Sequence, residues 1–502
     1  MRLNVVQRHP WDVEADVLAV TVPSSDELPP HLAEIDRRLD GALDELRQVG
    51  ALKGSRWAGR LLPARGLAAR LLLLVAVGDG EALDRLDARR LGTVIVKQLA
   101  GVEARTLAVH LPQVLASGAE QAAVVELVAR GLVEGAEDPS TLYNERSDKL
   151  PPELDAVTFS VESGDLEQLA EQARRGRIIG EGGNRTRRLA HRAANDVSPE
   201  VLADEASDLA AAHGLELTVL GPEQAETMGM GMFMAVGRGS DNPPRFIALR
   251  NKPTRETDAR GRLLAMVGKG VTFGTGGISL KPPPNMCEMK SDQTGACTVI
   301  NAIATAAQLA PEVPLLAVAP ALENMPGPHS TRPGDVVRAL NGKTVEVNNT
   351  DAEGRLILGD AMTWAEQQGA THLVDVATLT GAMMRALSRY MTGGFGSDDS
   401  WWDEVAAAAA RQGEPLWRMP ILDDLRKDLD SPFADMSNIG TAEGGAITAA
   451  LFLREFVTVP WAHLDIAGTA YLSKTDPFST KGATGVMHAT LVELALDAAA
   501  VA

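Results

Sequence analysis

The sequence predicts an α/β protein with two domains, and three observations carry that prediction. The chain has 502 residues, which exceeds the usual size of one domain. Short aliphatic runs alternate with longer helical patterns in both halves, as in folds where helices cover a sheet. An arginine-rich helical pattern at residues 164–195 lies between the halves. We therefore predict domains at residues 1–163 and 196–502, joined by a linker helix.

The first domain shows a regular alternation of strand and helix patterns. Helices are expected at His31–Val49 and Glu120–Leu132. The region contains no intact glycine-rich phosphate loop, no His/Cys cluster in sequence and no nucleophile motif. It therefore predicts an α/β domain without chemistry of its own. The expected strands are Leu3–Val6, Val17–Val22, Leu71–Val77, Thr106–Leu111 and Ala156–Val161.

The linker begins with Asp165, a residue type that caps helices well. Leu166, Leu169 and Ala170 would share one face. Each interior glycine costs a helix about 1 kcal/mol relative to alanine. The glycines at 176, 180, 182 and 183 therefore weaken the prediction of an unbroken helix.

The second domain repeats the alternation on a larger scale. Helices are expected at Pro199–His213, Thr298–Leu309, Leu356–Gln368 and Asp403–Arg411. The pattern is typical of a doubly wound or mixed sheet. The expected strands are Leu215–Leu220, Phe246–Leu249, Leu263–Val267, Leu315–Val318, Leu373–Ala377 and Ala462–Ile466.

Composition restricts the class of protein. A net charge of -19 disfavours broad binding to nucleic acids or acidic membranes. The arginines between 174 and 192 could form a local basic patch, but a solvated helix face explains them better. Cys287 and Cys297 match no metal or redox spacing, and two cysteines in so long a chain favour a reducing compartment. The start of the chain lacks the apolar region of a signal peptide, and the aliphatic runs are too short to span a bilayer. These features predict a cytoplasmic protein.

A first candidate site lies at Asn348–Leu356. Asp351, Glu353 and Arg355 occupy alternate positions, which would share one face of an extended segment. Two carboxylates on one face require a neutralising cation, from the arginine or from a metal. A solvated turn with a surface Arg–acid pair is the alternative for this stretch by itself.

A second candidate site lies at Met266–Asp292. Lys269 stands where a buried strand is expected to end, and glycines surround it. Ligands gather beyond the carboxyl ends of strands in such sheets. Lys281 and Asp292 follow in the same stretch. A lysine in this setting is a poor structural choice and a reasonable functional one.

Other hydrolytic chemistries find no support. The sequence has no HExxH and no GxSxG motif. His463 falls in an expected strand and His329 in an expected loop, and we interpret both as structural. Gly342-Lys343-Thr344 matches the end of a phosphate loop, but Val337 occupies the position of its first glycine, so a turn is the better interpretation.

Together the two stretches resemble the signature regions of the leucyl aminopeptidases, the two-metal M17 peptidase family. The resemblance covers most of the chain after about residue 180. It implies a macro-like N-terminal α/β domain and a C-terminal mixed-sheet α/β aminopeptidase domain. The matching blocks are NTDAEGRL (Asn349–Leu356), ENMPGPHSTRPGD (Glu323–Asp335), VDVATLTGA (Val374–Ala382), FADMSNIG (Phe433–Gly440), GGAITAALFL (Gly444–Leu453), HLDIAGTA (His463–Ala470) and KGATG (Lys481–Gly485).

The resemblance assigns roles to individual residues. It implies metal ligands at Lys269, Asp292, Asp351 and Glu353. It implies that Lys281 stabilises the oxyanion and that Arg355 holds a bicarbonate acting as general base. The side chain of the first substrate residue would meet a small, mostly apolar set of residues, namely Met289, Thr378, Gly381, Ala467 and Ala470.

The implied reaction is release of an N-terminal leucine or similar apolar residue from peptides. Two divalent ions, Mn²⁺ or Zn²⁺, would hold the substrate amine and carbonyl and a water that attacks as hydroxide. Lys269 would bind as a neutral amine, its pKa lowered by desolvation and a nearby dication. Members of the family assemble as homohexamers, so the same assembly is expected here.

One position departs from the family pattern. Gly274 stands where the family has an aspartate that bridges both metals. Loss of that carboxylate predicts that at least one metal position is weakened or empty and that activity is impaired. The alternative is a catalytically inactive homologue that serves as an oligomeric scaffold or a DNA-binding protein.

Overall fold

A computed structural model of the chain describes residues 1–25, 27–52, 55–78, 83–116, 120–147, 149–253 and 256–499. The chain divides into two compact units. Unit 1 comprises Met1–Glu181 with Thr475–Thr480, and unit 2 comprises Gly182–Lys474 with Lys481–Ala502. In the described residues no helix is long and apolar enough to cross a membrane.

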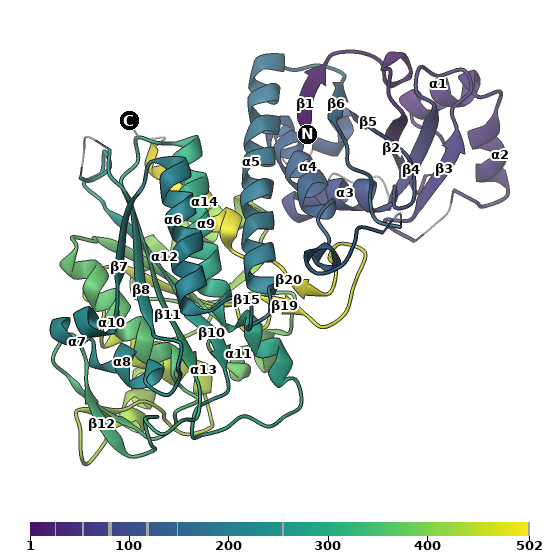
Figure 1. Ribbon diagram of the computed structural model, residues 1–502. Helices are drawn as coiled ribbons and strands as arrows, with labels where there is room; N and C mark the ends of the chain where they lie inside the picture. Colours follow the sequence, from purple (N-terminus) through teal and green to yellow (C-terminus); the bar gives the residue numbers. More distant parts are fainter. Residues whose placement is uncertain are drawn as a thin grey trace. The chain divides into compact units, whose positions relative to one another are not determined.

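Unit 1 is built on a mixed, mostly parallel sheet with the order β1-β6-β5-β2-β4-β3 (Figure 1). Every strand expected from sequence is present within two residues of its predicted bounds. The additional strand β3 pairs antiparallel with β4. The strands are β1 (Arg2–Val6), β2 (Val17–Pro23), β3 (Gly59–Pro63), β4 (Leu71–Gly78), β5 (Thr106–Leu111) and β6 (Ala156–Val161).

Helices cover both faces of this sheet. Helices α3 (Arg85–Lys97) and α4 (Gln121–Gly135) contribute to one buried core, and α1 (Pro30–Arg38) and α2 (Ala42–Gln48) to the other. The sequence predicts one helix where α1 and α2 stand. The chain breaks there because Asp40 and Gly41 both adopt positive φ, at 54° and 84°, which a right-handed helix excludes.

Helix α5 (Leu166–His191) runs unbroken through its glycines, and the division between the two units falls within it. Asp165 caps it by accepting the backbone N–H groups of Glu167 and Gln168. A Cβ at Gly176 would lie 2.1 Å from the carbonyl oxygen of Glu126 on α4. The glycine therefore permits close helix packing, which offsets its poor helix propensity.

Unit 2 contains a larger mixed sheet with the order β16-β15-β18-β14-β9-β11-β8-β7, with β10 paired to β11. All strands expected from sequence are present. The strands β9, β11, β14 and β18 are mutually parallel. The sheet comprises β7 (Glu216–Leu220), β8 (Arg245–Asn251), β9 (Leu264–Gly268), β10 (Gly270–Gly274), β11 (Leu315–Asn324), β14 (His372–Ala377), β15 (Thr392–Gly396), β16 (Leu416–Arg418) and β18 (Trp461–Asp465).

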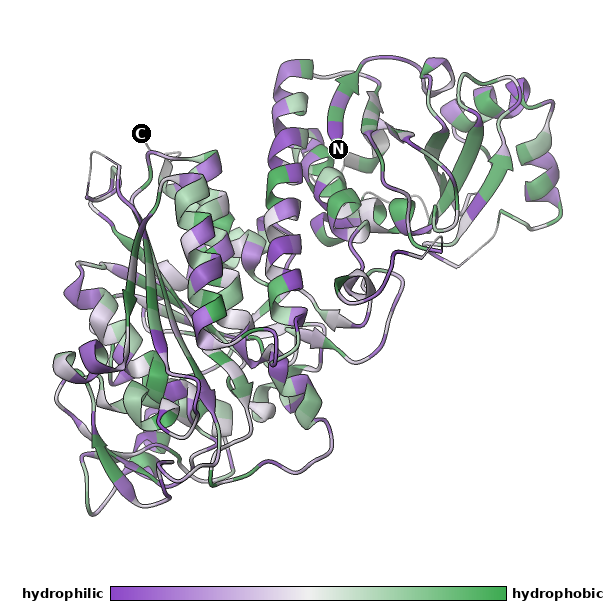
Figure 2. Ribbon diagram, viewed as in Figure 1, coloured by the Kyte–Doolittle hydropathy of each residue, from purple (hydrophilic) through white to green (hydrophobic). Residues whose placement is uncertain are grey.

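Two helical layers enclose this sheet, as Figure 1 shows. Figure 2 shows largely hydrophobic central strands and helices that carry both hydrophobic and hydrophilic residues. One layer contains α6 (Pro199–His213), α9 (Thr294–Leu309), α12 (Asp399–Arg411) and α14 (His488–Ala499). The other contains α7 (Pro222–Met228), α8 (Gly231–Gly237), α10 (Gly354–Gln367) and α13 (Gly445–Arg454). The expected two-domain α/β fold with mixed sheets is confirmed.

Smaller elements complete the described fold. Helix α11 (Gly381–Leu387) follows β14 and the 3₁₀ turn η4 (Met286–Gln293) precedes α9. The strands β12 (Asp335–Arg338), β13 (Thr344–Val347) and β17 (Met436–Ser437) form a small sheet, and β19 (Tyr471–Leu472) pairs with β20 (Gly482–Ala483). The remaining 3₁₀ turns are η1 (Pro10–Asp12), η2 (Gln113–Ala116), η3 (Pro139–Leu142) and η5 (Asp423–Leu429).

Candidate active site

Polar residues gather at the carboxyl ends of the parallel strands of unit 2. Lys269 follows β9, Asn324 ends β11, Thr378 follows β14 and Asp465 ends β18. Parallel strands present these ends at one edge of the sheet, where open α/β folds place their sites. The topology thus brings together residues that are far apart in sequence.

Lys269 lies at the centre of a buried charge cluster. Its Nζ lies 2.8 Å from Asp292 Oδ1 and 2.8 Å from Glu353 Oε1. It also donates a 3.0 Å hydrogen bond to the carbonyl oxygen of Thr378. Lys269, Asp292 and Glu353 are all buried. A fixed cation between two carboxylates marks a position that favours positive charge.

The ionisation of these groups follows from their contacts. Burial by itself lowers the pKa of Lys269, but Asp292 and Glu353 outweigh burial and raise it. Burial raises the pKa of Glu353, but Lys269 and Lys281 outweigh burial and lower it. Lys269 is therefore an ammonium as long as it alone neutralises the two carboxylates. The amine-ligand form expected from sequence requires a dication to replace that proton.

The Asp351–Arg355 stretch is not extended, and this corrects the prediction made from alternate spacing. Asp351 lies in a turn, and α10 begins at Gly354 with Glu353 as its N-cap. A Cβ at Gly354 would lie 2.9 Å from Lys269 Cδ and Cε. The glycine therefore lets the start of the helix lie against the lysine, and Glu353 reaches Lys269 from the helix terminus.

Asp351 extends the cluster toward Lys281, with which it forms an ion pair. Burial and the neighbouring Glu353 raise the pKa of Asp351, while Lys281 opposes the rise. The turn that carries Asp351 is held by Thr350, whose hydroxyl donates to the carbonyl of Gly276 at 2.6 Å and accepts the N–H of Ser279 at 2.8 Å. The Thr350 side chain thus ties the acid segment to the backbone of the lysine segment.

Sequence reasoning missed Asn324. Its Nδ2 donates to Glu353 Oε2 at 2.9 Å and to the carbonyl of Thr350 at 2.9 Å. It fixes the rotamer of Glu353 and links it to the Asp351 turn. The signal was its place in the Glu323–Asp335 block, which follows the expected buried strand Leu315–Val318.

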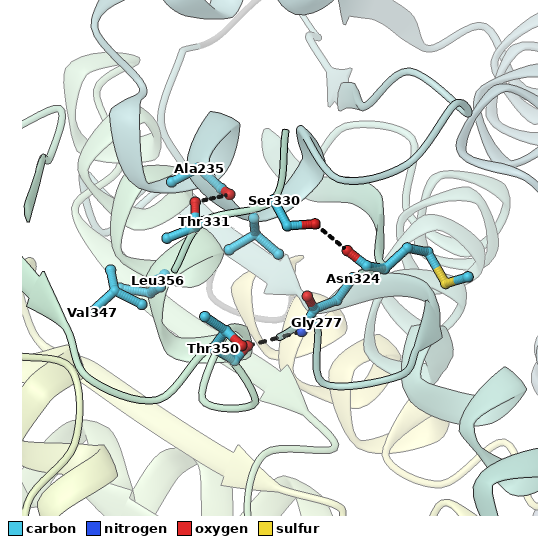
Figure 3. Close-up of a pocket in the computed structure, with 10 residues that line it drawn as sticks. Ala235, Gly277, Asn324, Ser330, Thr331, Val347, Thr350 and Leu356 are labelled. Carbon is cyan, nitrogen blue, oxygen red and sulfur yellow. Dashed lines mark hydrogen bonds between the residues drawn. The ribbon is translucent and has the colours of Figure 1, made fainter. Parts of the chain in front are cut away.

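Asn324 and Thr350 also line a small cavity, shown in Figure 3, with the hydrogen bond between them. The cavity has a volume of about 10 Å³, which is space for about one water molecule. It cannot receive a substrate side chain. Ala235, Thr331, Val347 and Leu356 also line it.

Arg355 lies on the first turn of α10 and is buried. Its Nη1 donates a 3.0 Å hydrogen bond to the carbonyl of Asn438. Its Nε is buried without a hydrogen-bond partner among the described residues. Burial lowers its pKa to about 10, although Glu353 and Asp465 oppose the fall. The guanidinium is charged at neutral pH and retains a donor for a small anion.

Gly274 ends β10 opposite Asn324 of β11. A Cβ at this position would lie 2.7 Å from Asp292 Oδ2. A side chain at residue 274 would therefore enter the carboxylate cluster directly. The glycine leaves the cluster with the carboxylates of Asp292, Asp351 and Glu353.

The expected substrate-binding residues vary in how closely they join the cluster. The Thr378 hydroxyl donates to Asp292 Oδ1 at 2.7 Å. The Ala467 N–H donates to Asp465 at 3.1 Å, and Asp465 also accepts the N–H of Leu379 next to Thr378. Met289 lies in η4 with Asp292, Gly381 begins α11, and Ala470 is buried after β18. No described contact joins these three to the charges.

The histidines interpreted as structural lie apart from the charge cluster. His463 is buried in β18, and its Nδ1 lies 2.6 Å from Asp375 Oδ1. Trp461 Nε1 donates to the other oxygen of Asp375 at 2.7 Å. Burial by itself lowers the pKa of His463, but Asp375 outweighs burial and raises it. The pair holds β18 against β14. His329 is exposed in a loop.

The fold and the cluster define a two-unit α/β protein with a buried lysine–carboxylate centre at the edge of its larger sheet. Residues 184–492 match the cytosol aminopeptidase family catalytic domain, and residues 17–140 match the N-terminal domain of the same family. The chain belongs to the cytosol aminopeptidase family, also known as peptidase family M17.

Relatives match along nearly the whole chain. A probable cytosol aminopeptidase of Solibacter usitatus is 42% identical over 501 residues, with 99% of each chain covered. One of Picosynechococcus is 39% identical over 476 residues, with 94% of each covered. A structure of a tomato leucine aminopeptidase mutant has a TM-score of 0.87 and 32% identity, covering 99% of this chain and 96% of that one. The bottromycin maturation enzyme BotP in complex with Mn has a TM-score of 0.82 and 31% identity, covering 96% and 99%.

Proposed function

We propose that this chain is a metal-dependent aminopeptidase that removes leucine or similar apolar residues from the N-termini of peptides. The observation that carries the proposal is the convergence of Lys269, Asp292, Asp351 and Glu353 from separate segments onto one buried edge of the sheet. The family of the chain and its peptidase relatives support the same reaction class.

The donor set fits divalent metal ions. Three carboxylates converge at this edge of the sheet, and in the absence of metal the ammonium groups of Lys269 and Lys281 neutralise them. Carboxylate oxygens suit Mn²⁺, Mg²⁺ and Zn²⁺. A solved relative in complex with Mn supports manganese among these. Lys269, Asp292, Asp351 and Glu353 would hold up to two ions, which would supply Lewis acidity toward the substrate carbonyl and lower the pKa of a bound water.

The protein's own residues supply orientation and charge. Asn324 and Thr378 fix the carboxylates of Glu353 and Asp292 through hydrogen bonds, so the acid groups need little reorganisation on binding a cation. Lys281 lies at the more exposed side of the cluster, beside Asp351. Its ammonium would stabilise negative charge that develops on the carbonyl oxygen of the scissile bond.

Arg355 fits a bound bicarbonate. A buried guanidinium with an unpartnered Nε needs an acceptor, and a small oxyanion provides one. Bicarbonate held there would accept and return a proton near the reacting water. This arrangement supports proton transfer without a histidine in the cluster.

Gly274 is proposed to impair metal binding. An aspartate there would place a fourth carboxylate against Asp292, and the glycine removes it. We propose reduced occupancy of one metal position and reduced turnover. A cytoplasmic location and a homohexameric assembly complete the proposal. The relatives named as cytosol aminopeptidases support the former, and resemblance to the family is the only support for the latter.

The test is hydrolysis of leucine p-nitroanilide by the full chain with Mn²⁺ or Zn²⁺, with and without bicarbonate. Glu353→Ala serves as the inactive control, and Gly274→Asp as the restored variant. Turnover above the control supports the proposal. Absence of turnover in both the unaltered chain and Gly274→Asp would overturn the proposal and favour the alternative, a catalytically inactive homologue.

A further inference from the structure

Unit 1 assembles a ligand set that its sequence did not reveal. One donor atom each from His31, His110 and Glu162 lies within 4.8 Å of the others. His31 is in the first turn of α1, His110 is in β5, and Glu162 directly follows β6. All three belong to unit 1 and share no residue with the lysine–carboxylate cluster of unit 2.

The place of this set in the fold is where an open α/β sheet binds ligands. From β2 the chain continues to β4 on one side, and later returns to place β5 and β6 on the other side (Figure 1). The strand order therefore reverses between β2 and β5. His31 follows β2 and His110 lies near the carboxyl end of β5, so both flank the topological switch point.

Both imidazoles are held in a form that leaves a nitrogen for a ligand. His110 Nδ1 lies 3.2 Å from Ser160 Oγ and 3.3 Å from the Ser160 carbonyl. The backbone of Thr21 hydrogen-bonds the imidazole of His31. On each ring Nε2 is buried and has no hydrogen-bond partner among the described residues. A buried, unpartnered nitrogen is costly, and a metal ion would satisfy both rings.

The carboxylate is also oriented. Glu162 Oε2 accepts the backbone N–H of Gln113 at 3.1 Å, and no ion pair of Glu162 is present in the described part of the chain. Each of the three residues thus has an outer partner on the protein, as metal ligands generally do. His110 is only 2% exposed, whereas Glu162 is exposed at the surface.

The three residues line a cavity of about 530 Å³ that gives an ion a path to the site. Arg8 lines the same cavity, so the cavity does not attract cations through a general negative charge. Cation binding would depend on the three directed donor atoms. A tetrahedral zinc ion with bonds of about 2.0–2.2 Å separates its ligands by roughly 3.4 Å. The three donor atoms lie within 4.8 Å of one another, so binding a zinc ion requires them to approach by at most roughly 1.4 Å.

We propose that His31, His110 and Glu162 form a binding site for one divalent transition-metal ion at the sheet edge of unit 1. Two imidazoles and one carboxylate leave at least one position open, which is a donor set that suits Zn²⁺ and Co²⁺. The nitrogen ligands separate it chemically from the carboxylate-dominated cluster of unit 2. The ion would be held entirely by residues of unit 1 and would take no part in peptide hydrolysis.

The test uses metal-stripped full-length protein carrying Glu353→Gln, which weakens the cluster of unit 2. Co²⁺ is titrated while visible absorption and bound metal are measured. One Co²⁺ per chain with the spectrum of imidazole coordination is expected. Glu162→Gln and His31→Gln, added separately, should each weaken binding by at least about 100-fold. Neither residue is part of the buried core, and the melting temperature of each variant checks that its fold is retained.

His213→Gln, a half-buried histidine of α6 in unit 2, is the matched control and should leave the titration unchanged. Equal Co²⁺ binding in the Glu162→Gln, His31→Gln and His213→Gln variants would overturn the proposal. Absence of bound Co²⁺ in the Glu353→Gln parent would overturn it as well. These outcomes do not depend on whether the chain hydrolyses peptides.

Discussion

Gly274→Asp is the perturbation that probes the proposed metal cluster most deeply. The new Cβ would lie 2.7 Å from Asp292 Oδ2, so the Asp292 side chain must shift and the added carboxylate must lie beside it. Two unit charges about 4 Å apart interact with about 4 kcal/mol at an effective dielectric constant of 20. Without metal, this repulsion destabilises the folded chain, and the melting temperature should fall.

With a dication present the balance reverses. Attraction of the new carboxylate to a doubly charged ion at a similar distance is about 8 kcal/mol, and the repulsion from Asp292 cancels from the change in affinity because it is present with and without metal. Screening by the neighbouring charges and side-chain relaxation reduce this value, and a retained part of about 1.4–4 kcal/mol corresponds to about 10-fold to 1000-fold tighter binding. We therefore expect the affinity for Mn²⁺ to rise between about 10-fold and 1000-fold, with a matching rise in kcat/KM.

The assay is Mn²⁺ titration of metal-stripped protein by calorimetry, followed by leucine p-nitroanilide hydrolysis at saturating metal. Gly274→Asn is the matched control because it adds nearly the same volume without the charge. Equal metal affinity and equal kcat/KM in the aspartate and asparagine variants would show that residue 274 does not face the metals. That result would refute the electrostatic reasoning.

Three further outcomes are expected. Lys281→Met should lower kcat about 10²–10³-fold, as loss of an oxyanion donor does, without lowering the metal content measured by mass spectrometry; parallel loss of metal would assign it a ligand role instead. Arg355→Met should abolish stimulation by bicarbonate, and persistent stimulation would place the anion elsewhere. His463→Gln should destabilise unit 2 at low pH. The pKa of His463 is raised in the fold, so its protonated form stabilises the fold fully below about pH 6.5, and this stabilisation is lost as the pH rises through the folded pKa. The melting temperature of the variant should therefore approach that of the unaltered chain as the pH rises above about 6.5. A difference that grows with pH would reverse the assigned charge state.

Much of the fold was predictable because its strands are buried on both faces. Leu71–Val77 is aliphatic throughout and Leu373–Ala377 is aliphatic apart from Asp375, and both were placed to within one residue. Strand β10 was missed because only Lys269 separates it from β9 and because it is rich in glycine. The break between α1 and α2 was missed because the single glycine at position 41 was the only local signal for the positive φ angles of Asp40 and Gly41.

The sequence supplied the proposed members of the candidate site, and its prediction of their backbone conformation was wrong in one segment. Alternate charges suggested an extended Asp351–Arg355 segment, but the chain turns and begins a helix there. The Thr350 hydroxyl, which donates to the carbonyl of Gly276, and the Asn324 side chain, which donates to the carbonyl of Thr350, hold that geometry, and both bonds join segments that are distant in sequence. The histidine and glutamate set of unit 1 was invisible for the same reason, because only the sheet brings His31, His110 and Glu162 together.

Anomalous diffraction from manganese-soaked crystals of the full chain tests the central proposal most directly. Density at the manganese edge is expected between the carboxylates of Asp292 and Glu353, with Lys269 Nζ as a further neighbour and weaker density beside Asp351. If the anomalous peaks lay only elsewhere in the protein, or if no peak lay beside these residues, the proposal that they hold the metals of an aminopeptidase would be contradicted.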